Sequence, residues 1–263
     1  MRFVHLSDLH FGAHDEVIAQ ALALDVREQN PDVVVVSGDF TQIGSEQEFR
    51  AAGAFLESLN LPIFAVPGNH DVPARNLWLR MIDPYRRYRT YISPDLEPTL
   101  TIGPAMFVGI KTSRRMRFGL NWSHGSISPA QLRAVNERLA AAPKGKVKII
   151  VAHHPLLQPE QAMTKAMRLV SGAEEALDLF ARLDVRLVLS GHFHRSYQRH
   201  HQAKVVQVQN AGGQQAPPML VLQAGSAIST RLRDDGNSYN IIDLLGDETT
   251  IQVRQWRGPH WTS

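Results

Sequence analysis

The sequence predicts an α/β fold built on a parallel β-sheet, and three observations carry this prediction. Short apolar runs alternate with longer amphipathic segments over residues 2–66, which is the βαβ pattern. The run from Val33 to Val36 is apolar throughout, which is typical of a strand covered on both faces. Strand-like runs without helices between them follow residue 203, which predicts an antiparallel continuation and leaves a second sheet open.

Apolar spacing and turn residues define the elements of the first half. Residues 15–29 carry apolar side chains along one broad face, and Asn30-Pro31 ends this predicted helix. The last strand of this half leads through Pro67 into a polar segment, Gly68-Asn69-His70-Asp71. In order, the prediction is a strand at 2–6, a helix at 15–29, a strand at 33–36, a helix from about 45 to 59 and a strand at 62–66.

Residues 72–101 interrupt this alternation and predict a short helical insertion over the polar strand ends. Apolar residues such as Trp78 and Tyr88 recur there at helical spacing, with arginines between them. Two interpretations stay open. Either the apolar stripe packs on the core and the arginines face solvent, or some of the arginines face a substrate.

The second half repeats the strand and helix pattern before it changes. Two of its strands end in histidine-rich segments, at 153–155 and 190–194. Residues 209–218, which contain glycine and proline pairs, are predicted to form a mobile loop. The predicted elements are strands at 105–110, 147–152 and 185–189, helices at 128–141 and 172–183, and strand-like runs at 204–208, 219–223, 239–245 and 249–256. No repeat or linker indicates two units, so a single domain over residues 1–263 is expected.

The composition restricts both the class of protein and the chemistry of its ligands. A chain of 263 residues that is 43% hydrophobic can form a substantial core, which favours a globular enzyme. The chain has no cysteine, so disulfides and thiolate ligands are excluded, and any metal must be held by His, Asp, Glu or Asn. The net charge is only +3, and most of the basic residues are arginines. This combination favours a small anionic ligand over a nucleic-acid partner.

The sequence also bears on location. No run approaches the roughly 18 apolar residues of a transmembrane helix, and the amino terminus carries no signal-like apolar region. We therefore expect a cytoplasmic protein, with peripheral membrane contact left open and no prediction of oligomeric state.

Polar side chains follow five of the predicted strands at their C-terminal ends. Because α/β proteins bind ligands at this edge of the sheet, we expect these side chains to converge. Oxygen and imidazole donors without sulfur suit manganese, iron or zinc. A carboxylate on a central strand, that of Asp39, could give one oxygen to each of two ions. The converging residues are Asp8, His10, Asp39, Asn69, His70, His153, His192 and His194.

Five motifs, in their order along the chain, resemble the calcineurin-like metallophosphoesterase superfamily. They are Asp8-Leu9-His10, Gly38-Asp39, Gly68-Asn69-His70-Asp71, His153-His154-Pro155 and Gly191-His192-Phe193-His194. The resemblance implies a four-layer α/β/β/α sandwich with mixed sheets and two divalent or trivalent metal ions, of manganese, iron or zinc. The implied ligands are Asp8, His10, Asp39 and His194 for one ion, and Asp39, Asn69, His153 and His192 for the other. The family pattern places the ligand two residues before proline, which favours His153 over His154.

The implied activity is hydrolysis of a phosphoester at a dinuclear metal centre. Two cations about 3.5–4 Å apart would lower the pKa of a bridging water, and the hydroxide would attack phosphorus in line. His70, which is not a ligand, would protonate the leaving oxygen or stabilise its charge, and Asp71 would orient the imidazole. Gly38, Gly68 and Gly191 would permit sharp turns before the ligands.

The substrate stays open among several members of this superfamily. Length, the Gly-Asn-His-Asp motif and one modest insertion look most like the bacterial class III cyclic-nucleotide phosphodiesterases, which implies a small phosphodiester as partner. One alternative is a UDP-diacylglucosamine pyrophosphatase, whose motif typically has arginine where this chain has His70. A broad phosphomonoesterase and phosphodiesterase is another, and a non-catalytic scaffold is the last. The superfamily's DNA-repair nucleases usually carry further domains, so no stable nucleic-acid partner is expected.

Overall fold

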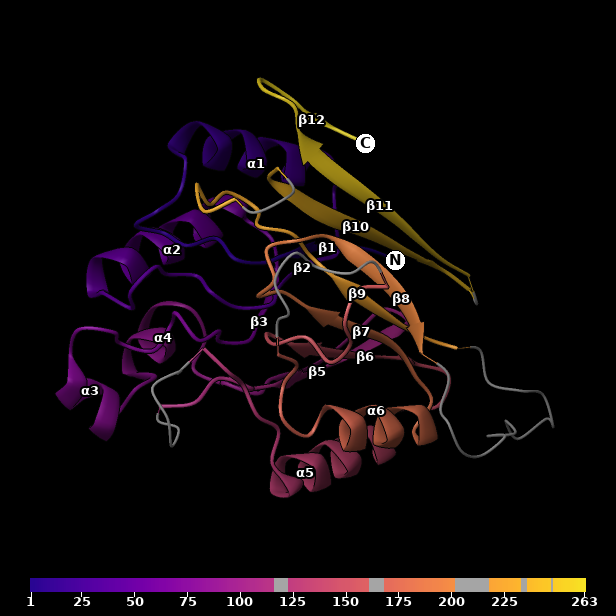
Figure 1. Cartoon of the computed structure of the whole chain (residues 1–263). Helices are drawn as coiled ribbons and strands as arrows, with labels where there is room; N and C mark the ends of the chain where they lie inside the picture. Colours follow the sequence, from indigo (N-terminus) through magenta and orange to yellow (C-terminus); the bar gives the residue numbers. More distant parts are fainter. Residues whose placement is uncertain (116–122, 161–167, 202–217, 233–235, 247) are drawn as a thin grey trace.

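The computed structural model consists of two six-stranded sheets packed face to face, with helices on both outer faces (Figure 1). It describes residues 1–115, 123–160, 168–201, 218–232, 236–246 and 248–263. The strand order is β12-β11-β10-β1-β2-β3 in the first sheet and β4-β5-β6-β7-β9-β8 in the second. The predicted four-layer α/β/β/α sandwich with mixed sheets is confirmed.

The first sheet joins the amino-terminal parallel strands to the carboxy-terminal hairpin. Its strands are β1 (Arg2–Leu6), β2 (Val33–Val36), β3 (Ile63–Ala65), β10 (Ser238–Leu245), β11 (Glu248–Trp256) and β12 (Trp261–Thr262). β1, β2 and β3 are parallel, whereas β10 pairs antiparallel with β1 and starts the hairpin. Its outer face packs against α1 (Glu16–Glu28) and α2 (Glu46–Leu59).

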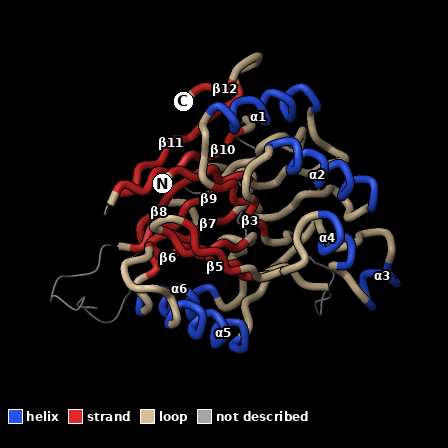
Figure 2. The backbone as a smooth tube through the Cα atoms, turned by 180° about the vertical axis from the view of Figure 1, so that it is seen from behind, coloured by secondary structure: helices blue, strands red, loops and turns tan. Residues whose placement is uncertain are grey.

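The second sheet is parallel in its centre and antiparallel at both edges. Its strands are β4 (Thr99–Ile102), β5 (Ala105–Ile110), β6 (Val147–Ala152), β7 (Val185–Ser190), β8 (Tyr197–His201) and β9 (Met219–Gln223). Its outer face packs against α5 (Pro129–Ala140) and α6 (Ala173–Arg182). Figure 2 shows from behind that α1 and α2 lie on one side of the strands and α5 and α6 on the other.

The core forms between the layers because side chains alternate along each strand. In β2, Val33 and Val35 point between the two sheets, where they join Phe107 of β5 in one cluster. Val34 and Val36 point the other way, toward the helices. All four valines are fully buried, as the continuous apolar run predicted.

The principal helices begin at polar caps that the sequence supplies. Asp15 accepts hydrogen bonds from the first turn of α1, and Ser45 forms a capping box with Glu48 at the start of α2. Ser128 and Pro129 open α5 in the same way. These caps fix the residue at which each helix begins after the preceding loop.

Strand pairing differs from the prediction in the last part of the chain. Residues 219–223 form β9, which pairs parallel with β7 on one side, so the expected antiparallel continuation holds only for its other side. Strand β8 was not predicted; it pairs antiparallel with β9. The predicted run at 204–208 and all but the last residue of the predicted loop at 209–218 lie outside the described residues. The spacing of apolar residues in the sequence indicates which side chains are buried, but it does not indicate whether the neighbouring strand is parallel or antiparallel.

The predicted insertion over residues 72–101 contains α3 (Leu77–Ile82) and α4 (Arg86–Tyr91), and its last residues enter β4. β4 is an edge strand paired with β5, so the helical part of the insertion ends before residue 99. Tyr88 is fully buried while the Trp78 side chain is 77% exposed, so only the second helix packs on the core. Arg80 and Arg87 donate hydrogen bonds to backbone carbonyls. None of the helices in the described residues has the length and apolar character needed to cross a bilayer.

Candidate metal centre

The C-terminal ends of strands from both sheets meet and bring the predicted polar residues together. The ends of β1, β2 and β3 come from the first sheet, and those of β6 and β7 come from the second. The predicted convergence therefore draws on strand ends from both sheets of the sandwich. Among the described residues, potential ligand atoms within 4.8 Å of one another form four groups, which are Asp8, His10 and His194; Asp8, Asp39 and His153; His10, Asp39 and His70; and His153, His154 and His192.

One half of the cluster surrounds Asp8. His194 Nε2 lies 3.2 Å from Asp8 Oδ1, and His10 Nε2 lies 3.6 Å from the same oxygen. The two imidazole nitrogens are 3.2 Å apart. The second carboxylate oxygen, Asp8 Oδ2, accepts hydrogen bonds from Ser7 Oγ and from the backbone N–H of His192. Oδ1 is thus the oxygen that faces the cluster.

The other half surrounds Asp39. Its Oδ2 lies 3.2 Å from His153 Nε2 and 3.8 Å from His10 Nε2, so one oxygen faces both halves. Asn69 Oδ1 lies 3.1 Å from His153 Nε2 on the same side. Oδ1 of Asp39 accepts a hydrogen bond from the His70 backbone N–H. In this geometry Oδ2 is the Asp39 oxygen that lies near imidazoles on both sides, whereas Oδ1 is engaged by the loop backbone.

Two buried carboxylate oxygens test whether this cluster fits a metal. Asp8 Oδ1 and Asp39 Oδ2 are buried and have no hydrogen-bond partner. Leaving such an atom unpaired costs free energy that native structures rarely tolerate, and a bound cation would compensate both oxygens. Carboxylate, amide and imidazole donors together suit manganese, iron or zinc. The residues present therefore fit a metal centre.

Backbone carbonyls hold two of the imidazoles in the orientation that a metal needs. His153 Nδ1 donates to the Ser37 carbonyl at 2.7 Å, and His194 Nδ1 donates to the Arg231 carbonyl at 3.1 Å. A carbonyl oxygen only accepts, so Nδ1 carries a hydrogen in each ring, and Nε2 is the ring atom that faces the cluster and could bind a cation. Such outer contacts orient histidine ligands in metal sites.

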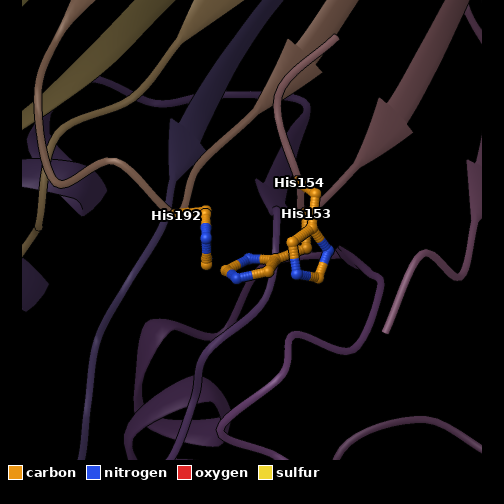
Figure 3. Close-up of side chains that lie close together, drawn as sticks. All are labelled: His153, His154 and His192. Atoms are coloured by element: carbon orange, nitrogen blue, oxygen red, sulfur yellow. The ribbon is translucent and has the colours of Figure 1, made fainter. Parts of the chain in front are cut away.

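Three adjacent histidines at the ends of β6 and β7 lie side by side (Figure 3). The rings of His154 and His192 are 4.6 Å apart, so proximity alone would count His154 as a ligand. Both of its ring nitrogens are already engaged, because Nδ1 lies 2.7 Å from Thr112 Oγ1 and Nε2 lies 2.9 Å from the Ser123 carbonyl. This geometry favours His153, the residue the sequence preferred.

His70 lies beside the cluster with its ring held by the backbone. Its Nδ1 donates to the Gln42 carbonyl at 2.6 Å, and its ring centroid lies 4.8 Å from that of His10. Burial lowers the pKa of the His70 imidazole. The predicted contact with Asp71 is wrong, because Gln42 and not Asp71 orients this ring.

Asp71 instead ties together the two loops that carry Asp39 and Asn69. Its Oδ2 accepts from the backbone N–H groups of Gly68 at 2.8 Å and Asp39 at 3.0 Å. Its Oδ1 accepts from the backbone N–H and the hydroxyl of Thr41, both at 3.1 Å. Burial, with the nearby Asp39 carboxylate, raises the pKa of Asp71 to about 7. Asp71 thus holds the loop that carries Asn69 against the loop that carries Asp39.

The comparisons with known proteins agree with this geometry. A family model described as calcineurin-like phosphoesterase matches residues 1–196. The chain belongs to this family.

Individual relatives of this calcineurin-like phosphoesterase are distant. A probable glycerophosphodiester phosphodiesterase, GpdQ, from Arcobacter nitrofigilis is 28% identical over 63% of this chain and 57% of its own length. The 3',5'-cyclic adenosine monophosphate phosphodiesterase CpdA from Haemophilus influenzae is 25% identical over 67% of this chain and 60% of its own. The chain thus matches less than two thirds of the length of these curated relatives.

A solved structure with the same fold is a dimetal phosphatase from Danio rerio. It has a TM-score of 0.69 and 14% sequence identity, and the alignment covers 97% of this chain and 96% of that chain. At this identity the likeness concerns the fold alone.

The backbone of this calcineurin-like phosphoesterase is strained at the candidate ligands. Asp8, His10, Asp39, His192 and His194 all have positive φ angles, between 50° and 76°. Residues other than glycine adopt this left-handed region uncommonly, and such strain collects at functional sites. Sequence reasoning missed this feature. The signal that the sequence offers is that each residue lies two to four positions beyond the end of a strand.

The glycines beside these ligands serve two different needs. Gly38 has a φ of +96°, as the predicted sharp turn requires. Gly68 and Gly191 do not, so the prediction is wrong for them. A Cβ on Gly68 would lie 2.8 Å from Asp39 Cγ, and a Cβ on Gly191 would lie 2.6 Å from Asp8 Oδ2. These two glycines provide room for the carboxylates.

Charge within the cluster keeps both carboxylates ionised. Burial would raise the pKa of Asp8, but the surrounding imidazoles, His194 first, outweigh it and lower that pKa. The pKa of Asp39 is likewise held well below its usual value, against burial, mainly by His153. The pKa of His153 rises to about 9, because the attraction of Asp39 and other contacts exceed the opposing effect of burial. The protein thus presents anionic oxygens to a cation.

Replacing Asp71 with alanine is expected to lower the free energy of unfolding by about 3 kcal/mol, because three buried N–H groups lose their acceptor. Urea unfolding of the metal-free protein measures this effect. Asp178→Ala on α6 is the control and should change little. Unchanged stability together with a shifted pH–rate profile would instead favour the orienting role that the sequence predicted.

Proposed function

We propose that this protein is a dinuclear metal-dependent phosphodiesterase acting on a small anionic substrate such as a cyclic nucleotide. The observation that carries the proposal is Asp39 Oδ2, a buried carboxylate oxygen without a hydrogen-bond partner that faces two groups of potential ligand atoms. Family membership and two relatives named as phosphodiesterases support the same reaction class. Their different substrates leave the choice of phosphodiester open.

The proposed ligands divide between two ions that share Asp39. The first set is Asp8, His10, Asp39 and His194, and the second is Asp39, Asn69, His153 and His192. Manganese, iron or zinc ions bound there would polarise a phosphoryl oxygen and supply an activated water at neutral pH. Ser37 and Arg231 would keep the ligand imidazoles in place through their carbonyls.

His70 is proposed to act on the leaving oxygen of the substrate. Its Nδ1–H is held by the Gln42 carbonyl, so Nε2 is the atom that can take up a proton and pass it on. Its ring packs edge-on against His10, which places it beside the cluster but outside the proposed ligand sets. Asp71 contributes indirectly, by holding the loop that carries His70 against the loop that carries Asp39.

Changing His70 to alanine is expected to lower kcat by about 10²–10⁴-fold, the usual contribution of a positioned proton donor. The metal content should stay near that of the wild type, because His70 is in neither ligand set. Turnover of bis(p-nitrophenyl) phosphate and elemental analysis of the same samples measure both. His260→Ala, at an exposed position, is the control. Loss of bound metal in the His70 variant would contradict this role.

The function itself is tested by assaying bis(p-nitrophenyl) phosphate with added Mn²⁺, and then p-nitrophenyl phosphate under the same conditions. A higher kcat/KM on the diester supports a phosphodiesterase, and equal values indicate the broad phosphatase alternative. A panel of cyclic nucleotides, glycerophosphodiesters and nucleotide-linked lipids then narrows the substrate. Absence of turnover with manganese, iron and zinc would support a non-catalytic scaffold. The single domain and the cytoplasmic location stay predictions, which limited proteolysis and cell fractionation test.

A further inference from the structure

The segment after β9 returns to the cluster and is anchored there. Ser226 Oγ donates to the Asp8 carbonyl at 2.8 Å, which fixes the start of this segment beside a candidate ligand. At its other end the Arg231 carbonyl accepts a hydrogen bond from His194 Nδ1. The backbone of Arg231 is therefore fixed relative to the cluster, and this fixes the Cα atom from which its side chain extends.

The guanidinium of Arg231 lies at the edge of the His70 imidazole. Its Nη1 is 3.4 Å from His70 Nε2 and 3.3 Å from Gln42 Oε1. His70 Nδ1 carries its hydrogen toward the Gln42 carbonyl, so Nε2 has the lone pair and accepts from Nη1. Both contacts are long for hydrogen bonds, so they can be exchanged at small cost.

Arg231 keeps most of its donor capacity. A guanidinium has five N–H donors, and only Nη1 is engaged in side-chain contacts within the described part of the chain. No carboxylate among the described residues forms an ion pair with it, whereas Arg2 and Arg254 are paired with Asp243 and Asp25. The Arg231 residue is also exposed. Within the described residues, a cation without a carboxylate partner therefore lies at the exposed edge of the candidate metal centre.

We propose that Arg231 binds an anionic oxygen of the substrate phosphoryl group, which makes it a substrate-binding residue of the phosphoesterase function proposed above. The planar fork of a guanidinium matches two phosphoryl oxygens better than an ammonium group does. Binding moves Nη1 from His70 Nε2 to the substrate oxygen. The same movement frees Nε2, the atom through which His70 is proposed to act. Nε2 is therefore available only while a phosphoryl group is bound.

The test compares metal-loaded wild type, Arg231→Gln and Arg231→Lys, with Arg257→Gln as the matched control. Arg257 is exposed and lies between β11 and β12, and its side chain donates a hydrogen bond to Gln255 of β11. Calorimetry gives the Kd of inorganic phosphate, steady-state assays with bis(p-nitrophenyl) phosphate give KM and kcat, and elemental analysis gives metal content. We expect Arg231→Gln to raise the phosphate Kd and the diester KM by about tenfold or more, because the variant loses a charge-assisted hydrogen bond to the phosphoryl group.

The other readouts separate this role from a merely structural one. Arg231→Lys should recover part of the phosphate affinity, since it restores the charge without the fork. Metal content should be unchanged in both variants, because the carbonyl that holds His194 belongs to the backbone. Phosphate affinity and KM equal to the wild type in Arg231→Gln, or loss of metal in that variant, would overturn the proposal.

Phosphate binding also separates this inference from the proposed function. A wild type that binds phosphate but hydrolyses no phosphoester contradicts the function, and the Kd of Arg231→Gln still decides the role of the guanidinium. A metal-loaded wild type that binds no phosphate would overturn the Arg231 assignment directly.

Discussion

Changing Asp39 to asparagine is expected to lower phosphodiester turnover roughly a thousandfold or more, since several kcal/mol of transition-state stabilisation depends on the ions it holds. Asp39 Oδ2 is buried without a partner and faces both His153 and His10. An amide in its place offers no negative charge to either ion. The remaining oxygen, Oδ1, can still accept from the His70 backbone N–H, so the loop should keep its shape.

Metal titrations followed by thermal unfolding check the origin of this loss. Ions that bind only the folded wild type should raise its Tm further as their concentration increases, and Asp39→Asn should lose most of that rise. Asp178→Asn on α6 should behave like the wild type. If Asp39→Asn bound metal as tightly as the wild type and kept its turnover, the proposal that Asp39 Oδ2 serves both ions would be wrong.

Replacing Gly68 with alanine is expected to destabilise the fold by roughly 3 kcal/mol and to remove activity as well. The added Cβ would lie 2.8 Å from Asp39 Cγ and would approach Asp39 Oδ1 and its backbone nitrogen more closely still. A backbone atom cannot move aside as a flexible side chain can, so the two loops must separate. Separation would also break the hydrogen bond from Gly68 N to Asp71.

Urea unfolding of the metal-free proteins isolates the steric effect from metal binding. Gly236→Ala is the matched control, because a Cβ there meets no atom within 4 Å. We expect a lower midpoint for Gly68→Ala and an unchanged midpoint for Gly236→Ala. Equal stability of Gly68→Ala and wild type would mean that the close approach of the two loops is not required.

The candidate site was predictable because each of its residues belongs to a short segment just beyond an apolar strand. Parallel strands place such ends together, so Asp8, Asp39 and His153 could be grouped from sequence order alone. The partner of a side chain was harder to predict. Asp71 follows His70 directly, yet its carboxylate turns to the backbone of Gly68, Asp39 and Thr41. Neighbours in sequence need not be neighbours in a hydrogen-bond network.

Arg231 shows the same limit from the opposite direction. In the sequence it is one of many arginines, 161 positions from His70. Only the return of the segment after β9 brings its guanidinium to the imidazole and its carbonyl to His194. The apolar stripe at 77–91 also divides in the structure, because Tyr88 is buried and Trp78 is exposed.

By itself the sequence determined where most of the strands and the major helices lie, which residues end the strands and which donors could hold a cation. These features depend on local spacing, on turn residues and on the chemistry of the side chains. Only the tertiary structure decided which parallel strands belong to which of the two sheets, that a single oxygen of Asp39 faces both halves of the cluster, and that Asp71 holds two loops together. The physical reason is that periodicity records whether a side chain is buried, whereas pairing and hydrogen bonding depend on distant segments that fill the same space.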